Sequence, residues 1–298
     1  MAGPVTAHLS WLDDFLTWAV DEGNAPVDLV TSHLYPTDTI VDQNDRFGWV
    51  KAVGTAAGVA GRRGLNFTLS EFNAGLARDT DLRDGPYTSA FLGHLASASQ
   101  RLPANVEGLS FWTFSDVFEE PGLISAPFHG GFGMSTVHDV NKAAWCALAL
   151  LAAHGDEAVS VAVGGQPAGP VPGASAGSID VAATRGAGGA LVVSVANFMP
   201  STMPESNTTR VTLNITGLAH SGGAARTVLV QRVDADSCNP LATWKRQGRP
   251  TYPSVAQLAA LRADAQPSSA SVACAGSGTA CSLTVEMPPL GMALLTVR

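Results

Sequence analysis

Two hydrophobic patterns alternate along the first half of the chain. Apolar, β-favouring runs over residues 27–36, 65–73 and 106–116 each end in polar or aromatic residues, as parallel strands buried on both faces do. A short strand-like segment comes before the first of them, at residues 3–7. Between the runs, apolar residues recur with a helical period. We expect these helices at residues 11–22, 47–59, 87–99 and 142–154. This alternation with short connections predicts βαβ units and a parallel sheet.

The pattern changes near Gly155. A stretch rich in Gly, Pro and Ala, residues 164–177, leads into short alternating runs bounded by turn residues, which predict an antiparallel β-sandwich. A single helical insert is expected at residues 254–265. The strands are expected at residues 190–198, 209–215, 227–234, 281–287 and 290–297. The sequence therefore predicts two domains, an α/β domain over residues 1–156 and an all-β domain over residues 157–298.

Composition limits the partners. With 298 residues, 46% of them hydrophobic and 14% charged, the chain is long enough for two folded domains. The net charge of −8 argues against nucleic acid or an anionic membrane as a partner. No apolar run reaches the roughly 18 residues that a membrane-spanning helix needs. The seven histidines show no metal-ligand spacing, and there is no phosphate loop or dinucleotide fingerprint, so we expect no metal and no cofactor.

The cysteines and glycosylation sequons point to an oxidising compartment. We expect Cys238 to form a disulfide with Cys274 or Cys281, and Cys146, on an apolar helix, to stay reduced. Asn-x-Ser/Thr sequons favour a glycoprotein of the secretory pathway, extracellular or in a lysosome-like lumen. They lie at Asn66, Asn207 and Asn214. The chain does not start with a signal peptide, so we expect that residue 1 is not the natural beginning.

Candidate functional residues gather where the strand-like runs end. Carboxylates accept hydrogen bonds from vicinal hydroxyls, His and Asn bind single hydroxyls, and an aromatic face stacks on a pyranose, so together they suit a sugar pocket. Each alone has a structural explanation, such as a core histidine or a packing tryptophan. Their shared position at the ends of successive parallel strands favours a site. They are His33, Tyr35, Glu71, Asn73, Trp112, Asp116, Glu119 and Glu120.

Several strings around these residues resemble one family. The strings are Thr31-Ser32-His33-x-Tyr35-Pro36, Ser70-Glu71-Phe72-Asn73, Phe111-Trp112-Thr113-Phe114-Ser115-Asp116-Val117-Phe118-Glu119-Glu120 and Phe128-His129-Gly130-Gly131-Phe132-Gly133. They are similar to glycoside hydrolases of family 39, which contains β-xylosidases and α-L-iduronidases, and the resemblance covers nearly the whole chain. It implies a (β/α)8 barrel followed by a β-sandwich, and retaining hydrolysis.

The resemblance also implies roles for individual residues. Glu71 matches the family's nucleophile. The family's general acid/base is a Glu in an Asn-Glu-Pro string, and this chain contains no Asn-Glu dipeptide. We therefore expect the chain to be the C-terminal half of the barrel plus the sandwich, inactive alone. The family also uses some of the candidates to bind substrate, and these are His33, Tyr35, Trp112, Glu119 and Glu120.

The expected substrate is a neutral pentoside of the β-xyloside type. An iduronide would need a cation beside its carboxylate, because an unpaired buried charge costs several kcal/mol. Arg78 and Arg83 are the nearest cations, and the sequence places them in a polar loop. Two alternatives remain: an α-L-iduronidase-like glycosaminoglycan hydrolase, which the tail of the chain resembles, and a carbohydrate-binding fragment without catalysis.

Overall fold

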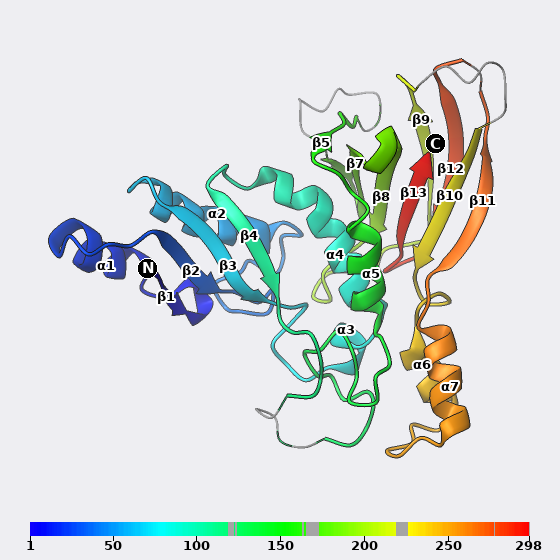
Figure 1. The fold of residues 1–298 in the computed structure, drawn as a ribbon, viewed down its shortest axis with the longest axis horizontal. Helices are drawn as coiled ribbons and strands as arrows, with labels where there is room; N and C mark the ends of the chain where they lie inside the picture. The colour runs from blue at the N-terminus through cyan, green and yellow to red at the C-terminus, as the bar shows by residue number, and fades with distance from the viewer. Residues whose placement is uncertain are drawn as a thin grey trace.

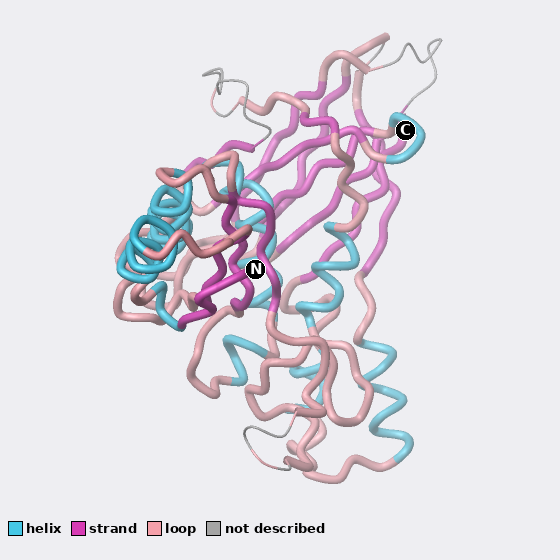
Figure 2. Tube along the Cα trace, turned by 60° about the vertical axis from the view of Figure 1, so that its left-hand side comes forward, coloured by secondary structure: helices cyan, strands magenta, loops and turns pink. Residues whose placement is uncertain are grey.

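The computed structural model describes residues 1–118, 122, 124–162, 164, 173–218, 226–276 and 278–297. The chain forms a parallel α/β region at its N-terminal end and an antiparallel β region at its C-terminal end (Figure 1). Figure 2 separates the two groups of strands, the parallel ones near the N-terminus and the antiparallel ones that lead to the C-terminus. The two predicted classes of structure are therefore present in the predicted order.

The parallel sheet has the strand order β1-β2-β3-β4. Its strands are β1 (Ala2–Thr6), β2 (Leu29–His33), β3 (Asn66–Phe72) and β4 (Val106–Phe111). All neighbours run parallel, so the carboxyl ends of the four strands meet at one edge. The pairing register shifts near that edge, and the shift places His33 directly opposite Glu71. Sheet pairing thus brings two of the predicted residues together.

Helices cover this sheet and connect its strands. The helix α2 lies along one face of the sheet (Figure 1) and packs Trp49 and Val53 into the core. The first helix, predicted over residues 11–22, is present as α1 (Leu12–Leu16), which continues into a π-helical segment, Thr17–Glu22. A short 3-10 turn, Ala7–Leu9, comes before it. A further 3-10 turn, Ser99–Arg101, follows α4. The α-helices are α1 (Leu12–Leu16), α2 (Gly48–Gly61), α3 (Thr80–Arg83), α4 (Pro86–Ala98) and α5 (Ala143–Leu151).

The β region is a two-layer antiparallel structure. In the larger sheet the order is β11-β10-β13-β8-β7-β5, with β6 paired to β7. The second layer holds β9 and β12, and a separate hydrophobic core fills the space between the layers. The strands are β5 (Glu157–Ala158), β6 (Gly173–Ala176), β7 (Ile179–Arg185), β8 (Leu191–Asn197), β9 (Thr209–Ile215), β10 (Arg226–Val233), β11 (Ser268–Cys274), β12 (Cys281–Met287) and β13 (Met292–Val297).

Two helices of the β region form one insert between β10 and β11. They are α6 (Pro240–Arg246) and α7 (Val255–Asp264), and the Ser254 side chain caps the start of α7. The insert packs against the segment that leads to α5, and the rings of Phe128 and Trp244 lie 5.6 Å apart. The insert therefore supports a loop of the α/β region. A short 3-10 turn, Ala187–Gly189, joins β7 and β8.

The helices α4 and α5 stand between the two sheets (Figure 1). On β13, Met292 and Leu294 belong to the core that these helices share with the parallel sheet, whereas Leu295 belongs to the core between the antiparallel layers. Because successive residues of a strand face opposite sides, one sheet serves both cores. The predicted division at residue 156 falls in the loop between α5 and β5, but the hydrophobic core crosses it.

The disulfides differ from the prediction. Cys146 is bonded to Cys238, and Cys274 is bonded to Cys281, so the expected pairing of Cys238 and the expected free thiol of Cys146 are both wrong. The reason is that α5 lies against the segment that follows β10, which brings cysteines 92 residues apart in sequence into contact. Within the part of the chain that is described, no helix is long and apolar enough to cross a bilayer.

Candidate active site

Glu71 lies at the carboxyl end of β3 with partners on both carboxylate oxygens. The Tyr35 hydroxyl donates a hydrogen bond to Oε1, and His33 Nδ1 lies 3.2 Å from Oε2. The Glu71 side chain keeps 19% of its surface exposed, so the carboxylate is oriented by protein groups yet open to a ligand. Burial, and then the neighbouring Glu71, raise the pKa of Tyr35, which keeps its hydroxyl protonated as a donor. The structure thus brings together three of the predicted site residues.

Asn73 has a different role from the one predicted. It is buried, and its amide nitrogen donates to the carbonyl oxygens of Trp112 and, at 3.0 Å, Phe132. Its Oδ1 accepts from the amide of Ala74 at 2.6 Å. All of these contacts are to backbone, so Asn73 ties the end of β3 to the segments that follow β4 and does not face substrate.

Trp112 follows β4 and stays partly exposed. Its amide donates to the carbonyl of Phe72 at 2.8 Å, which continues the pairing of β3 and β4 beyond the strands. Its ring meets that of Phe118 edge-to-face, with centroids 5.5 Å apart. A partly exposed indole next to the Glu71 strand is suited to stacking on a sugar. Glu119 and Glu120, the two acidic residues predicted beyond it, lie outside the described residues.

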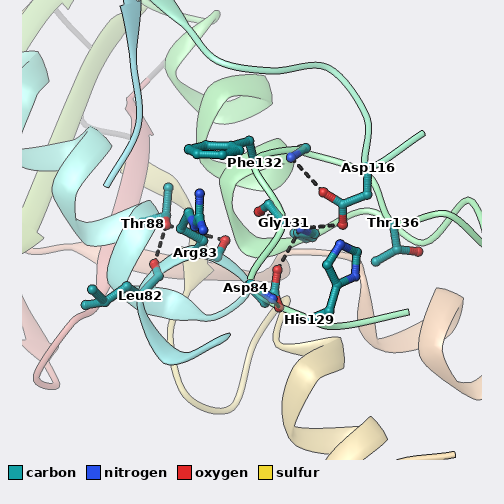
Figure 3. Close-up of polar contacts among 12 residues, drawn as sticks. Leu82, Arg83, Asp84, Thr88, Asp116, His129, Gly131, Phe132 and Thr136 are labelled. Atoms are coloured by element: carbon teal, nitrogen blue, oxygen red, sulfur yellow. Dashed lines mark hydrogen bonds and ion pairs between the residues drawn. The ribbon is translucent and has the colours of Figure 1, made fainter. Parts of the chain in front are cut away.

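Asp116 is not in the pocket. It is buried in an ion pair, with Oδ2 2.7 Å from Lys142 Nζ, and its Oδ1 accepts from the amide of Gly133 at 2.7 Å (Figure 3). Both oxygens are occupied by the protein, so the prediction that Asp116 binds substrate is wrong. A loop carboxylate was expected to face solvent or ligand, but the segment folds back and covers it.

The residues that surround Asp116 were not predicted. Lys142 Nζ also lies 2.6 Å from Asp84 Oδ1, and the side chains of all three residues are fully buried. Arg83 is buried beside them, with its guanidinium over the face of the Phe132 ring (Figure 3). Burial lowers the pKa of Arg83, with the neighbouring Asp84 opposing the shift. A lysine at the start of an apolar helix is the only available signal, and it does not reveal burial.

No metal centre is evident in the described ranges: no three His, Cys, Asp or Glu side chains gather there in a way that could hold an ion. What the strand ends offer is a fixed carboxylate, a tyrosine donor, a histidine and an aromatic face. A carboxylate held in this way can attack an anomeric carbon, and the surrounding groups can bind sugar hydroxyls. These are the kinds of group that bind and orient a sugar.

Comparison with known proteins agrees with the site. Residues 1–280 match the family model for glycosyl hydrolases family 39, and the chain belongs to this family. It is 26% identical over 260 residues to a β-xylosidase of Caldicellulosiruptor saccharolyticus, covering 85% of this chain and 50% of that protein. The chain thus spans half the length of this relative.

Solved structures share the fold. The GH39 enzyme from Xanthomonas axonopodis pv. citri superposes with a TM-score of 0.76 at 22% identity, covering 100% of this chain and 60% of that one. A monomeric β-xylosidase from Caulobacter crescentus superposes with a TM-score of 0.75 at 23% identity, covering 100% of this chain and 61% of that one. At these identities the likeness concerns the fold, a TIM barrel with a β domain in those enzymes.

Proposed function

We propose that this chain carries the nucleophile half of a retaining β-xyloside hydrolase. The observation behind the proposal is the Glu71 carboxylate, held at the end of β3 by Tyr35 and His33. In the first step Glu71 attacks the anomeric carbon and forms a glycosyl ester while the aglycone leaves. In the second step water attacks the same carbon and releases the sugar with retained configuration.

The second carboxyl group is proposed to come from polypeptide other than this chain. A retaining enzyme needs a general acid/base roughly 5–5.5 Å from the nucleophile. Among the described residues, no other carboxylate joins the group hydrogen-bonded to Glu71. Both β1 and β4 are edge strands of the parallel sheet, and Val5 and Trp11 are exposed on the β1 side. Such edges favour pairing with further strands, which would close a (β/α)8 barrel.

A neutral pentoside is the proposed substrate. Tyr35, His33 and Trp112 offer hydroxyl and ring contacts, and no Lys or Arg of the described residues pairs with Glu71. One observation favours the iduronide alternative: Arg83 is not in an exposed polar loop but is 2% exposed, close to the site. Its guanidinium, however, is separated from Glu71 by the rings of Phe132 and Tyr35. Among the described residues, no Lys or Arg side chain pairs with Glu71 in a way that could meet a substrate carboxylate there.

We also propose passage through the secretory pathway. Asn207 and Asn214, which carry two of the sequons, are exposed. All four cysteines are paired, and disulfides persist in oxidising compartments. Treatment of the secreted protein with a glycosidase that removes N-glycans should lower its mass, and loss of the shift in Asn207→Gln and Asn214→Gln would locate the glycans.

The nucleophile is tested with 2,4-dinitrophenyl 2-deoxy-2-fluoro-β-xyloside. Its leaving group departs without protonation, so ester formation does not depend on the missing acid, and this chain itself can be used. We expect an intact-mass increase of one fluoroxylosyl group, mapped by peptide mass spectrometry to Glu71. Glu71→Gln should stay unlabelled. Glu107→Gln is the matched control, because Glu107 lies at the opposite end of the sheet, bonded to Asn66.

The outcomes separate the alternatives. An adduct on another carboxylate would refute Glu71 as nucleophile. Binding of xylose without any adduct would favour a carbohydrate-binding fragment. For protein that also holds the acid/base, kcat/KM for 4-methylumbelliferyl β-xyloside and α-iduronide should be compared, and preference for the iduronide would overturn the proposed substrate.

A further inference from the structure

Four buried charges lie together beneath the loop of residues 128–133. Lys142 Nζ stands between Asp84 and Asp116, at 2.6 and 2.7 Å, and one ammonium facing two carboxylates leaves a negative excess. Arg83, directly before Asp84, is equally buried and restores the balance. Burying each ion carries a large desolvation penalty, so such a group is a weak source of stability. Its value lies in the geometry that it fixes.

The charges hold the loop at three points. The amide of Gly130 donates to Asp84 Oδ2 at 2.7 Å, and that of Gly133 donates to Asp116 Oδ1 at 2.7 Å. Lys142 Nζ donates to the carbonyl of Gly131 at 3.1 Å. A Cβ on Gly131 would lie 2.3 Å from Asp116 Oδ1, so only glycine allows this approach. The path of the loop is therefore fixed by the cluster.

The loop carries Phe132 between the cluster and the catalytic residues. Its carbonyl accepts from Asn73 Nδ2 at 3.0 Å, and its ring meets the Tyr35 ring edge-to-face with centroids 5.9 Å apart. On the ring face, the guanidinium carbon of Arg83 lies 3.8 Å from the centroid (Figure 3). Tyr35 in turn donates to Glu71. Arg83, Phe132, Tyr35 and Glu71 thus form a continuous series of contacts.

The Arg83 guanidinium contacts the Phe132 ring without making a hydrogen bond to the described residues. None of its three guanidinium nitrogens has a hydrogen-bond partner in the described residues, although all are buried. A buried guanidinium ordinarily donates hydrogen bonds from its N–H groups, because each unpaired buried donor costs free energy. What the guanidinium has instead is the ring face and the nearby carboxylates, a cation–π contact in a desolvated place.

We propose that Arg83 is a positioning residue for the Glu71 nucleophile, acting through Phe132 and Tyr35. The guanidinium holds the Phe132 ring, the ring limits the orientations of Tyr35, and the Tyr35 hydroxyl orients the carboxylate. A displacement of about 1 Å at a reacting group can cost about 100-fold in rate. The role requires a cation, so lysine should replace arginine in part, whereas the similarly long but neutral methionine should not. This inference rests on the proposed role of Glu71.

The kinetic test uses the fluoroxyloside on the full chain. In Arg83→Met we expect the limiting rate of inactivation to fall about 10- to 100-fold, with little change in the inhibitor concentration for half-maximal rate. In Arg83→Lys the limiting rate of inactivation should lie within about five-fold of the wild-type rate. Arg101→Met is the matched control, because Arg101 makes the same kind of contact 4.1 Å from the Phe47 centroid, away from the site. It should react like wild type.

A second measurement does not depend on reactivity. The chain has three tyrosines, so ¹³C-labelled tyrosine gives few ring signals. In Arg83→Met we expect the Tyr35 signal to shift, those of Tyr87 and Tyr252 to stay, and Arg83→Lys to return the Tyr35 signal toward wild type. If the wild-type chain is not labelled by the fluoroxyloside at all, the proposed function is wrong. The tyrosine signals still test whether Arg83 positions Tyr35.

Phe132→Leu covers the case in which Arg83→Met does not fold, since it removes the ring and keeps the cation. It should shift the same Tyr35 signal and slow inactivation similarly. A folded Arg83→Met or Phe132→Leu protein with the wild-type Tyr35 signal and inactivation rate would overturn the proposal. Equal behaviour of Arg83→Lys and Arg83→Met would do so too, because the cation would then have no role.

Discussion

The two sheets of this protein differ in what their strand ends can do. In the parallel sheet all carboxyl ends meet at one edge, and His33 and Glu71 face each other there. In the larger antiparallel sheet neighbouring strands end at opposite edges, so residues that follow successive strands separate. Direction of pairing, more than the identity of the residues, explains why the candidate site belongs to the first region.

The β region still contributes to the site from a distance. One face of its larger sheet supports α4 and α5. Lys142 directly precedes α5, and Arg83 and Asp84 precede α4. The buried cluster is therefore positioned by helices that rest on the antiparallel sheet. The opposite face of that sheet packs on β9 and β12 in a separate core. Substitutions on the face that contacts α4 and α5 should therefore affect both regions. Substitutions on the face that contacts β9 and β12 should affect the β region alone.

The largest loss of stability is expected when the disulfide that joins the two regions is removed. Cys146–Cys238 joins the regions across 92 residues, whereas Cys274–Cys281 closes a loop within the outer layers across 7. Chain entropy predicts a loss of about 4.5 kcal/mol of unfolding free energy for the double alanine variant of the first pair and about 2.5 kcal/mol for the second. Urea denaturation without reductant measures both. Equal losses would mean that the long bridge does not couple the regions.

A smaller loss is expected for Asp180→Asn. The Asp180 carboxylate on β7 is fully buried and accepts from Ser175 Oγ at 2.6 Å, with Arg46 and His94 of the α/β region paired to its other oxygen. Asparagine keeps the shape but leaves the buried Arg46 without its counter-charge, which should cost about 3 kcal/mol.

The same measurement on Asp21→Asn provides the control for Asp180. Asp21 pairs with Arg63 at the surface, where one ion pair is worth below about 1 kcal/mol. If both variants lose equal stability, the buried pair does not hold the regions together.

Gly93→Ala probes the close approach of α4 to the antiparallel sheet. A Cβ at Gly93 would lie 2.8 Å from the Ala196 Cβ and 3.1 Å from Met292 Cγ. Overpacking should destabilise the protein by about 1–2 kcal/mol even though alanine favours helix. Gly58→Ala in α2 is matched, because nothing lies within 4 Å of its added Cβ, and it should stabilise by up to about 1 kcal/mol. Thermal denaturation compares them, and a more stable Gly93→Ala would contradict the tight contact.

The smallest effect is expected on the outer layer. Arg210 on β9 pairs with Glu286 on β12, with both side chains more than 60% exposed. A double-mutant cycle with alanine should give a coupling below about 0.5 kcal/mol, since solvent screens such pairs. The rate at which Glu71 is labelled should not change in the Arg210→Ala, Glu286→Ala or double variant. A coupling above about 1.5 kcal/mol, or slower labelling, would show that the outer layer also influences the site.

The strand ends could be predicted because their signal is local. Buried strands, helical periods and the residues that follow them are properties of short segments, and the parallel direction then places Glu71, His33 and Tyr35 at one edge. Strands without such a signal were missed: β7 was not expected, and β11 is short of large apolar residues and mostly exposed. The helices α3 and α6 were missed because each is only about two turns or less.

By itself, then, the sequence determined the two kinds of sheet, their order along the chain and the carboxylate at the centre of the site. Tertiary structure decided which polar residues face a ligand and which become buried supports. Asn73 and Asp116 read like pocket residues, and Arg83 like a surface cation, until packing from distant segments surrounds them. The physical reason is that periodicity reports which face of an element is apolar, whereas desolvation of a charge and the pairing of cysteines depend on residues far away in sequence.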